Sequence, residues 1–392
     1  MKKTISVLML LLAAIAWSAE SVTMYAAPRA CGDGGGLTSD NAAALSDQQF
    51  WAAVNAKLAQ TPVRVELAPG AYEISFKGKR SNAVRLTGIG NETNQLVIAG
   101  APGGGSVFGR SIADDQTRTI KNYLHLWVLS QCRNVALEEL FFTGPGVCGY
   151  VMQILDSQDI TIRNCEWRDM RGVYFAAAGA HGEKTRNVLW ENCTFANLGI
   201  DSHAHMLYNA NKAAGLTVRN CKFSDCTGDY IRFRNGNDDI TVENCDFMNS
   251  GEIEPVCPFL SMPLFVDFDE PKHYEYFAKK VTIRNNRFIF AKVNPRNIVL
   301  TYLHAGYNPP GRQYLLGKAD IAKLDQMSVA EGRKFLGERL GSDLDDIVIT
   351  GNKIVNSPMV VVYQSQPNWG AEKKFPKEEY KTETVLNRFF GF

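Results

Sequence analysis

A nine-residue phrase occurs four times within residues 159–247 and constrains the fold more than any other feature of the sequence. Each copy begins with alternating β-branched or aliphatic residues and ends in Asn-Cys-x-aromatic. The cysteines of the four copies are spaced 28, 28 and 24 residues apart: Cys165, Cys193, Cys221 and Cys245. A unit this short does not hold a helical hairpin or a propeller blade, and its alternation is that of a strand. The repeat predicts an all-β chain folded as a right-handed parallel β-helix.

Stacking of equivalent residues explains why the phrase repeats. In a parallel β-helix each coil pairs its backbone with the coils on either side at about 4.8 Å, so like side chains lie over like. An inward aromatic ladder is expected from Trp167, Phe195, Phe223 and Phe247. The outward positions alternate in charge, which suits ion-pair ladders: Arg163, Glu191, Arg219 and Glu243. A β-sandwich, the alternative, gives strands no reason to repeat one phrase in register.

The N-terminus has the features of a secretory signal peptide. It begins Met1-Lys-Lys, continues with an apolar run over residues 5–17 and reaches small residues near Ala19. We expect residues 1–19 to be removed on export to the periplasm or the medium, and residues 20–392 to form one β-helix domain. No other run approaches transmembrane length, so no membrane span is expected.

The charge balance limits the partners. The formal net charge is +1, so there is no global basic field to attract nucleic acid. We expect a monomer that meets any charged ligand through a local patch.

The chain contains nine cysteines, which in an exported protein favours disulfides. Four of them, however, occupy one equivalent position of the repeat. Stacked inward, they are expected to pack as small buried apolar side chains instead. Among the others, Cys226 and Cys257 are the best candidates for a bridge.

A helix is expected ahead of the coils. Ser46-Asp-Gln-Gln49 has the form of a capping box, and apolar residues follow at helical spacing. We expect a helix over residues 46–60 that covers the open end of the core, as a repeat fold requires. A strand and a Pro-Gly turn follow over residues 63–72. This order resembles the start of pectate-lyase-like β-helices.

The phrase returns after Phe247 at wider spacing, so segments are inserted between the later coils. The first insertion, residues 251–279, is rich in proline and aromatic residues and is expected to be a loop rather than a regular coil. The second, residues 309–344, contains the capping box Ser328-Val-Ala-Glu331 and a glycine stop at Gly341. Insertions on one side of a solenoid tend to line its binding face, so we expect these two to wall a groove.

Another strand precedes each copy of the phrase, and its outward positions change along the solenoid. They are apolar or small in the earlier coils and become polar, aromatic and cationic in two successive coils. The residues concerned are His203, His205, Tyr208, Lys212, Tyr230, Arg232 and Arg234. Such a face suits an anionic polysaccharide, because arginine holds a carboxylate with two hydrogen bonds and tyrosine offers an apolar ring with a hydroxyl.

On an exported β-helix this face predicts β-elimination of a uronate-containing polysaccharide. Neutralising the carboxylate acidifies the α proton, a base removes it, and an acid protonates the leaving glycosidic oxygen. We assign Lys212 as the base and Arg234 as the acid or carboxylate neutraliser, with His205 and Tyr208 as auxiliary catalytic groups. The expected substrate-binding residues are Arg232, His203 and Tyr230.

The segment Ile231-Arg-Phe-Arg-Asn-Gly236 is similar to the Leu-Thr-Leu-Arg-His-Gly motif of the chondroitinase B and alginate lyase family of polysaccharide lyases, which has this fold. The resemblance puts Arg234 at the family's catalytic arginine and Lys212 at its catalytic lysine. Gly251-Glu-Ile-Glu254 resembles the family's Gly-Glu-x-Glu segment, which implies calcium bound by Glu252 and Glu254. In the family that segment precedes the lysine, whereas here it follows the arginine.

A second alignment to the same family stays open. If Glu252 and Glu254 are matched first, Phe259 falls near the lysine position and Leu303 falls at the arginine position. Both catalytic groups would then be absent.

Two rival functions are considered. One is a non-catalytic, glycan-binding or surface β-helix. The other is an inverting glycoside hydrolase, because Asp238-Asp239 resembles the paired aspartates of polygalacturonases, although the accompanying His181-Gly182 here precedes them. A metal held by His203 and His205 lacks an evident third ligand.

Overall fold

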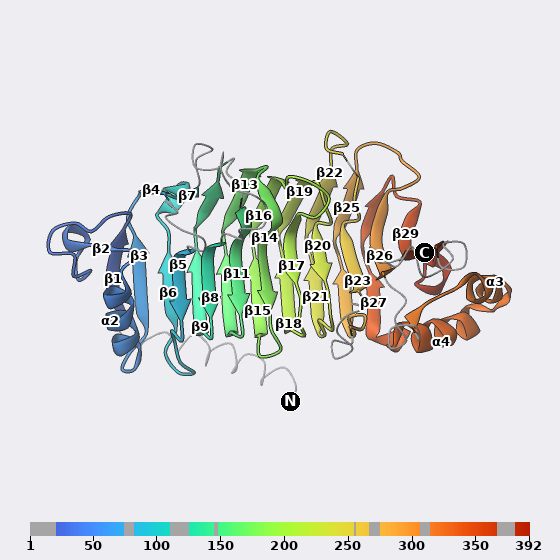
Figure 1. The fold of residues 1–392 in the computed structure, drawn as a ribbon, viewed down its shortest axis with the longest axis horizontal. Coiled ribbons are helices and arrows are strands. Elements are labelled where there is room, and N and C mark those ends of the chain that lie inside the picture. Colours follow the sequence, from blue (N-terminus) through green and yellow to red (C-terminus); the bar gives the residue numbers. More distant parts are fainter. Residues whose placement is uncertain are drawn as a thin grey trace, which may run out of the picture.

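The computed structural model describes residues 21–73, 82–109, 125–144, 148–254, 256–265, 275–305, 314–366 and 381–392. The strands wind into a solenoid whose coils stack along the long axis of the molecule (Figure 1). Neighbouring strands pair in parallel, except that the last strand, β30 (Thr382–Val385), is antiparallel to β29 (Met359–Gln366). The predicted parallel β-helix is confirmed. The predicted signal peptide lies outside the described residues.

Three sheets, here called A, B and C, run the length of the solenoid. Sheet A contains β2 (Ala43–Ala44), β1 (Val22–Ala27), β3 (Val63–Leu67), β6 (Leu96–Ala99), β9 (Arg133–Glu138), β12 (Gln158–Arg163), β15 (Arg186–Glu191), β18 (Ala214–Arg219), β21 (Ile240–Glu243), β24 (Val281–Arg284) and β27 (Ile347–Thr350). Sheet B contains β4 (Gly70–Glu73), β7 (Ser106–Gly109), β10 (Phe141–Thr143), β13 (Glu166–Met170), β16 (Thr194–Leu198), β19 (Lys222–Cys226), β22 (Asp246–Asn249), β25 (Arg287–Phe290) and β28 (Lys353–Val355). Sheet C contains β5 (Asn82–Thr87), β8 (His125–Ser130), β11 (Cys148–Leu155), β14 (Val173–His181), β17 (His205–Asn209), β20 (Ile231–Phe233), β23 (Leu260–Phe265), β26 (Ile298–Ala305), β29 and β30.

The repeated phrase forms sheets A and B in the register that the sequence predicts. The aromatic ladder is fully buried in sheet B. Its rings stack with centroids 4.6, 5.1 and 4.7 Å apart in the order Trp167, Phe195, Phe223 and Phe247. Burial of equivalent apolar side chains in every coil is what holds the coils in register.

The asparagine before each repeat cysteine makes the bend from sheet A to sheet B. The φ angles at Asn164, Asn192, Asn220 and Asn244 are 53°, 53°, 55° and 54°. This left-handed conformation strains most residues, but asparagine tolerates it. The asparagine therefore recurs in each copy because the backbone at this bend requires it, whereas the apolar residues recur because they pack in the core.

The repeat cysteines stack as free thiols. The amide of Cys193 donates to Sγ of Cys221, and the amide of Cys221 donates to Sγ of Cys245, each at 3.4 Å. All nine cysteines of the chain are free, so the considered bridge between Cys226 and Cys257 is absent. Burial raises the pKa of Cys226 to about 12, which fits an inert, apolar packing role.

The outward charges of sheet A form ion pairs between neighbouring coils, as predicted. Nε of Arg163 donates to Glu138 at 2.7 Å, and Nη2 of Arg219 lies 2.6 Å from Glu191. The next pair, Arg284 with Glu243, has the same separation of 2.6 Å. Each carboxylate therefore meets a cation on the adjacent strand of its own sheet.

Helix α2 (Gln48–Leu58) packs at the N-terminal end of the solenoid, next to β3 (Figure 1). Its buried residues Phe50, Trp51, Val54 and Leu58 belong to the same core as the sheets. The N-cap residue of this helix lies one position later than the sequence predicts. Asp47, rather than Ser46, caps the helix, and its carboxylate accepts from the amide of Gln49.

The first insertion is not wholly irregular, which corrects the expectation for residues 251–279. It contains β23, which pairs with β20 and β26 in sheet C. A proline within a strand usually breaks a ladder because it lacks an amide proton. Here β20 pairs with β23 at Ile231 and Arg232, so that ladder ends before it reaches Pro263.

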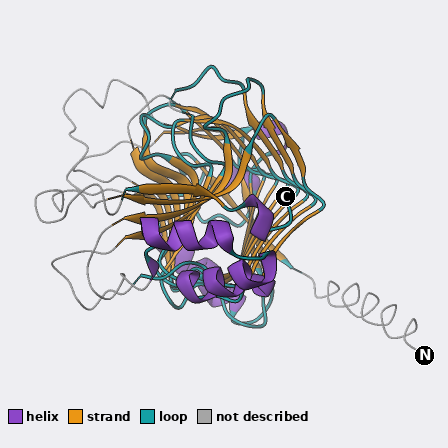
Figure 2. Cartoon of the chain, turned by 90° about the vertical axis from the view of Figure 1, so that its right-hand side faces the viewer, coloured by secondary structure: helices purple, strands orange, loops and turns teal. Residues whose placement is uncertain are grey.

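The second insertion folds into α3 (Lys318–Gln326) and α4 (Val329–Leu340). Ser328 and Glu331 form the predicted capping box, and Gly341 ends α4 with φ 65°. Figure 2, which faces the C-terminal end, shows helices in front of the stacked strands. The short 3-10 helices are η1 (Ser39–Asn41), η2 (Pro102–Gly104), η5 (Leu344–Asp346) and η7 (Asn387–Phe389). None of the helices in the described ranges combines the length and apolar composition that crossing a bilayer requires.

Candidate functional site

The strands of sheet C direct two successive residues into the core. The inward pairs are Leu126 with Trp127, Val151 with Met152, Ala177 with Ala178, Met206 with Leu207, and Tyr230 with Ile231. The next residue of each strand lies on the outer face, so Tyr208 and Arg232 are half-buried neighbours there, in register. The same doubling turns Tyr230 inward, where it is fully buried and its hydroxyl donates to the carbonyl of Met248 at 2.8 Å. Tyr230 is a core residue, which corrects its assignment to substrate binding.

Arg234, which directly follows β20, connects Tyr208 to the first insertion. Its Nη1 donates to Oη of Tyr208 at 3.0 Å, and its Nε and Nη2 donate to Oε1 of Glu275 at 2.9 and 2.6 Å. Glu275 is buried and also accepts from the amide of Phe265. Burial opposes the charge of Arg234, but Tyr208 and Glu275 outweigh it and raise its pKa. This fixed cation favours negative charge on the phenolic oxygen.

Arg232 is held by a carboxylate from its own turn. Its Nε and Nη2 donate to Oδ2 of Asp229 at 2.9 and 2.5 Å, and the hydroxyl of Ser261 donates to the same oxygen at 2.5 Å. Burial raises the pKa of Asp229, but Arg232, with His205 and Ser261, outweighs it and keeps that pKa below its ordinary value. Among the described residues nothing accepts from Nη1 of Arg232. That edge of the guanidinium is therefore available to a ligand.

His205 faces the same cluster from the start of β17. Its Nδ1 lies 3.3 Å from the carbonyl oxygen of Asp229, and its ring centroid is 5.3 Å from that of Tyr208. The ring is buried, and burial together with the charge of Arg232 lowers its pKa to about 3. His205 is therefore a neutral group that supports the turn carrying Asp229.

His181, at the end of β14, lies between two tyrosines. Its ring is nearly perpendicular to those of Tyr150 and Tyr208, at centroid distances of 5.3 and 5.4 Å. Gly179 allows the backbone of β17 to approach closely, since a Cβ there would be 1.9 Å from the carbonyl oxygen of Tyr208; it would also be 3.1 Å from Nε2 of His181. His181 is 4% exposed, and Nε2 has no hydrogen-bond partner among the described residues. Burial, with the charges of His125 and Arg234, lowers its pKa to about 3.

These residues form one outward group on sheet C, which we call the Tyr208 cluster. Its members are Tyr150, His181, His205, Tyr208, Asp229, Arg232, Arg234, Ser261 and Glu275. Four of the residues predicted from the sequence belong to it: His205, Tyr208, Arg232 and Arg234. The cluster combines a phenol, a neutral imidazole and two cations on one face, which are the groups needed to move protons beside an anion.

Lys212 and His203 lie outside the cluster. Lys212 is in the turn after β17, and its half-exposed ammonium lies 3.4 Å from the carboxylate of Glu183. A lysine base is favoured by burial, whereas this side chain is 51% exposed and pairs with a carboxylate. His203 precedes β17, is hydrogen-bonded to Asp201 at 3.1 Å and stacks on Tyr174. Only the second histidine is on the strand, so the two do not share a strand face.

The other sequence candidates also lie apart from the cluster. Glu252 and Glu254 are both exposed, and the described residues contain no group of three or more potential metal-ligating side chains. Calcium takes about six to eight oxygen ligands, so binding at Glu252 and Glu254 would need further oxygens and stays a prediction from the sequence. Asp238 accepts from the amide of Lys279 at 2.9 Å, and burial raises its pKa. Asp239 is exposed and 3.7 Å from Lys280.

Five members of the cluster were missed by the sequence analysis: Tyr150, His181, Asp229, Ser261 and Glu275. Glu275 lies 41 residues beyond Arg234 inside an insertion, so no repeat pattern connects the two. Asp229 stands three residues before Arg232, and its acidic side chain in a glycine turn was the available signal. His181 was noticed in the sequence, but in a polygalacturonase-like motif rather than as a neighbour of Tyr208.

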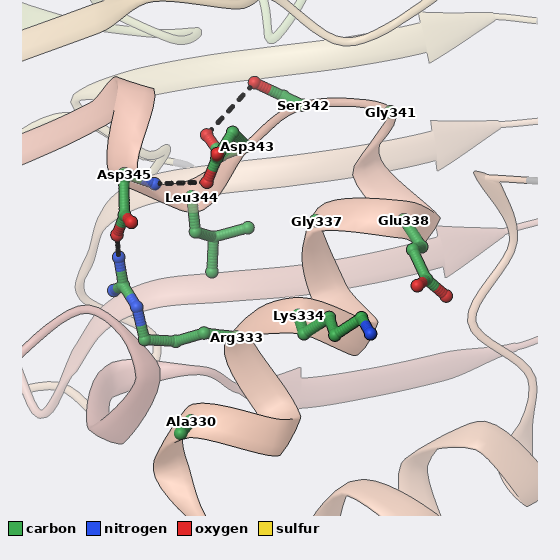
Figure 3. Close-up of a pocket in the computed structure, with 10 residues that line it drawn as sticks. All are labelled: Ala330, Arg333, Lys334, Gly337, Glu338, Gly341, Ser342, Asp343, Leu344 and Asp345. Carbon is green, nitrogen blue, oxygen red and sulfur yellow. Dashed lines mark hydrogen bonds and ion pairs between the residues drawn. The ribbon is translucent and has the colours of Figure 1, made fainter.

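A cavity of about 760 Å³ lies between α4 and η5, away from the Tyr208 cluster (Figure 3). It is lined by Arg333, Lys334 and Glu338 from the helix and by Asp343 and Asp345 beyond it. Arg333 already pairs with Asp345 at 2.5 Å, and that carboxylate is largely exposed. The cavity therefore presents solvated, self-paired charges and not a group prepared for catalysis.

Comparison with known proteins supports the fold. The family described as "Right handed beta helix region" matches residues 150–302. No curated protein matches the sequence.

Solved structures with similar folds share little sequence with this chain. Pectate lyase Pel9A is 12% identical over 74% of this chain and 72% of its own, with a TM-score of 0.39. An alginate lyase from Paenibacillus sp. str. FPU-7 is 13% identical over 73% of this chain and 94% of its own, with a TM-score of 0.40. The A-module of mannuronan C-5 epimerase AlgE4 from Azotobacter vinelandii is 14% identical over 64% and 86%, with a TM-score of 0.33. Likeness at this level carries no argument about activity. The register of the strands and the matched family model support one conclusion: the chain folds as a right-handed parallel β-helix.

Proposed function

We propose that this protein is a polysaccharide lyase that cleaves an anionic, uronate-containing glycan by β-elimination at the Tyr208 cluster. One observation carries the proposal. Arg234 donates to the hydroxyl of Tyr208 at 3.0 Å, and Arg232 is the neighbour of Tyr208 in register on the same half-buried outer face. A phenol supported by one cation and flanked by a second matches the demands of proton transfer next to a carboxylate.

In this proposal Arg232 binds the carboxylate of the uronate. Asp229 and Ser261 hold the guanidinium through Nε and Nη2, so Nη1 keeps a fixed direction toward the ligand. Neutralising the carboxylate acidifies the proton on the adjacent carbon. Loss of that proton forms the carbon–carbon double bond as the bond to the glycosidic oxygen breaks, and that oxygen takes up a proton. Tyr208 is positioned as a proton-transfer group, and Arg234 stabilises its phenolate form.

The proposal moves the proton transfer away from Lys212. Its ammonium faces Glu183 at the edge of the sheet, whereas the phenol of Tyr208 lies beside the group proposed to bind the carboxylate. The proposed steps use protein side chains alone, and calcium at Glu252 and Glu254 stays a separate prediction from the sequence. Export of the mature chain belongs to the same proposal, since such polymers lie outside the cell membrane.

An inverting hydrolase is the second candidate, and Asp238 favours it. Burial raises the pKa of its carboxyl, and the hydroxyl of Tyr276 lies 3.5 Å from Oδ2. A raised pKa is the direction of shift that a glycosidase needs in its general acid. Asp239 is the nearest candidate for the base.

A single assay distinguishes these functions. The purified protein is incubated with alginate, pectate and glycosaminoglycans, and the ultraviolet absorbance of unsaturated sugars is followed together with new reducing ends. Both signals rising in step is the expected result. Reducing ends without absorbance would replace the lyase by the hydrolase, and binding without either signal would leave a glycan-binding protein.

A further inference from the structure

The Tyr208 cluster contains several titratable side chains, but most are out of reach of a substrate. His181 and His205 are buried, and burial lowers the pKa of each to about 3. The buried carboxylates of Asp229 and Glu275 each pair with an arginine of the cluster. A group that takes a proton directly from a sugar must touch it, so these four side chains are excluded.

Tyr208 and the two arginines remain within reach of a sugar on the outer face. The side chains of Arg232 and Arg234 are 17% and 33% exposed, and a guanidinium keeps its proton in folded proteins, so they supply charge rather than protons. Tyr208 is half-buried, and its oxygen accepts from Nη1 of Arg234 at 3.0 Å. No other described residue hydrogen-bonds to that oxygen. The cluster thus offers one atom for proton transfer, the phenolic oxygen of Tyr208.

Two further candidates for proton transfer have partners of their own. Nζ of Lys212 lies 3.4 Å from the carboxylate of Glu183, and the hydroxyl of Tyr276 lies 3.5 Å from Oδ2 of Asp238. Neither side chain bonds to a member of the cluster in the described ranges. An elimination at Tyr208 therefore finds no second acid or base in these two residues.

The arrangement of the cluster is one-sided. Tyr208 and Arg232 are in register on adjacent strands, and Cζ of Arg232 lies 5.9 Å from the centroid of the Tyr208 ring. A uronate whose carboxylate is bound at Arg232 would present one side of its ring to the phenol. One oxygen that serves both proton transfers reaches only bonds on that side.

We propose that Tyr208 performs both proton transfers, and that the substrate is a uronate whose acidic C–H bond and C–O bond to the leaving oxygen lie on the same side of the ring. This inference rests on the lyase function proposed above and names the substrate class of that site. Mannuronate and glucuronate have the required configuration. In guluronate, galacturonate and iduronate the two bonds lie on opposite sides.

The protons and electrons balance on this one oxygen. Tyr208 starts as a phenolate, which the hydrogen bond from Arg234 stabilises. The phenolate takes the proton from the carbon that bears the carboxylate, and the electron pair of that bond becomes the carbon–carbon double bond. The glycosidic oxygen leaves with the electron pair of its own bond to the ring. The phenol then gives the same proton to that oxygen, which returns Tyr208 to the phenolate.

Two pairs of purified polymers test the substrate class. Polymannuronate and polyguluronate differ in configuration at the carbon that bears the carboxylate, and chondroitin and dermatan differ in the same way. The intact protein should form unsaturated product on polymannuronate or chondroitin with a kcat/KM at least about 100-fold above that on the matched epimer, because a misplaced proton-transfer group contributes nothing. Polygalacturonate should give no product.

Two variants and a pH profile test the single phenol. Tyr208→Phe keeps the ring and should lower kcat about 10,000-fold, because both proton transfers are lost. Tyr276→Phe is the matched control, since it removes a hydroxyl outside the cluster and should leave kcat unchanged. For the intact protein, kcat/KM should rise with pH and show no alkaline fall, whereas a separate acid would give a bell-shaped profile.

The other outcomes contradict the inference in ways that can be told apart. Equal rates on two epimers, or a preference for polyguluronate, dermatan or polygalacturonate, would require a group on the other side of the sugar. Near-normal kcat in Tyr208→Phe, an equal loss in Tyr276→Phe, or a bell-shaped profile would likewise overturn it. All of these results leave the lyase function standing. Absence of unsaturated product from every polymer would remove the lyase function and this inference together.

Discussion

The outer faces of sheets A and C both carry arginines, but they pair in different ways. On sheet A, Arg219 pairs with Glu191 on the adjacent strand, and the exposed fractions of their side chains are 39% and 21%. On sheet C, Arg234 pairs with Glu275, which comes from an insertion and is 7% exposed. The first kind of pair repeats from coil to coil. The second is built from an insertion and lies at the level of Tyr208.

This difference separates structural from functional charges in a repeat fold. An ion pair between equivalent positions of adjacent coils arises from the repeat itself, and it helps to hold the two strands in register. A pair built from an insertion or a turn departs from the repeat and brings buried carboxylates with it. The outer face of sheet C also contains neutral, buried histidines, which stabilise nothing by charge. Departures from the repeat are therefore where function is to be sought.

Arg232→Gln and Arg219→Gln compare one arginine from each face. The first should lower kcat/KM on a uronate glycan about 100- to 1,000-fold, because the cation that neutralises the carboxylate is lost. The second should leave kcat/KM unchanged, because Arg219 pairs with Glu191 away from the cluster. Initial rates of unsaturated product measure both.

The methyl-esterified form of the same glycan sharpens this comparison. Its ester carries no charge for Arg232 to neutralise, so the deficit of Arg232→Gln should shrink on this substrate. An equal deficit on acid and ester would show that Arg232 acts by holding the fold rather than by binding the carboxylate. Thermal unfolding of both variants checks that they remain folded.

Acid should destabilise the protein through the face of sheet C. His181 and His205 have pKa values lowered from 6.5 to about 3 in the folded protein. Between these two pH values the two histidines are protonated in the unfolded chain but not in the folded one. Their contribution is complete above pH 6.5 and is lost as the pH falls from there toward 3. The free energy of unfolding should drop by about 1.4 kcal/mol per pH unit for each histidine. Urea unfolding between pH 7 and pH 4 measures the slope.

His181→Phe and His205→Phe remove the titrating groups one at a time. Each variant should reduce the pH dependence of the free energy of unfolding by the contribution of one histidine, about 1.4 kcal/mol per pH unit. The pKa of Asp229 lies below its ordinary value of 3.8, so its contribution is lost only at lower pH and does not confuse this window. An unchanged slope in both variants would mean that the acid sensitivity arises elsewhere in the chain.

The coils could be predicted from the sequence because they obey one rule many times. The aromatic ladder, the asparagine bend and the stacked cysteines each follow from side chains lying over their equivalents. The site could be predicted in part, since Tyr208 and Arg232 interrupt the pattern visibly. A strict alternation of inward and outward residues predicts that Tyr230 faces outward. Tyr230 and Ile231 both point into the core, and no feature of the sequence indicates this pair of successive inward residues.

Contacts between the coils and the inserted segments could not be predicted from the sequence. Glu275 meets Arg234 because an insertion folds back against sheet C, and the path of an insertion is not set by the period of the coils. Lys212 looked suitable because it stands one coil before Arg234. The turn that holds it directs its ammonium to Glu183 instead. Sequence spacing identifies the coil of a residue but not the partner of its side chain.

The smallest expected effect compares Glu275→Gln with Glu191→Gln. Glu275 is buried and accepts hydrogen bonds from two nitrogens of Arg234. Its change to glutamine should lower the free energy of unfolding by about 1–2 kcal/mol. This value already allows for solvent screening, because the Arg234 side chain is one-third exposed. The ladder residue Glu191 lies nearer solvent, and its change should amount to about 0.5 kcal/mol, shrinking further in high salt. Urea unfolding at low and high salt gives both values. If the two glutamines destabilised the protein equally and with the same salt dependence, the charges of sheet C would be ladder charges like those of sheet A, and the burial that distinguishes the Tyr208 cluster would have no energetic consequence.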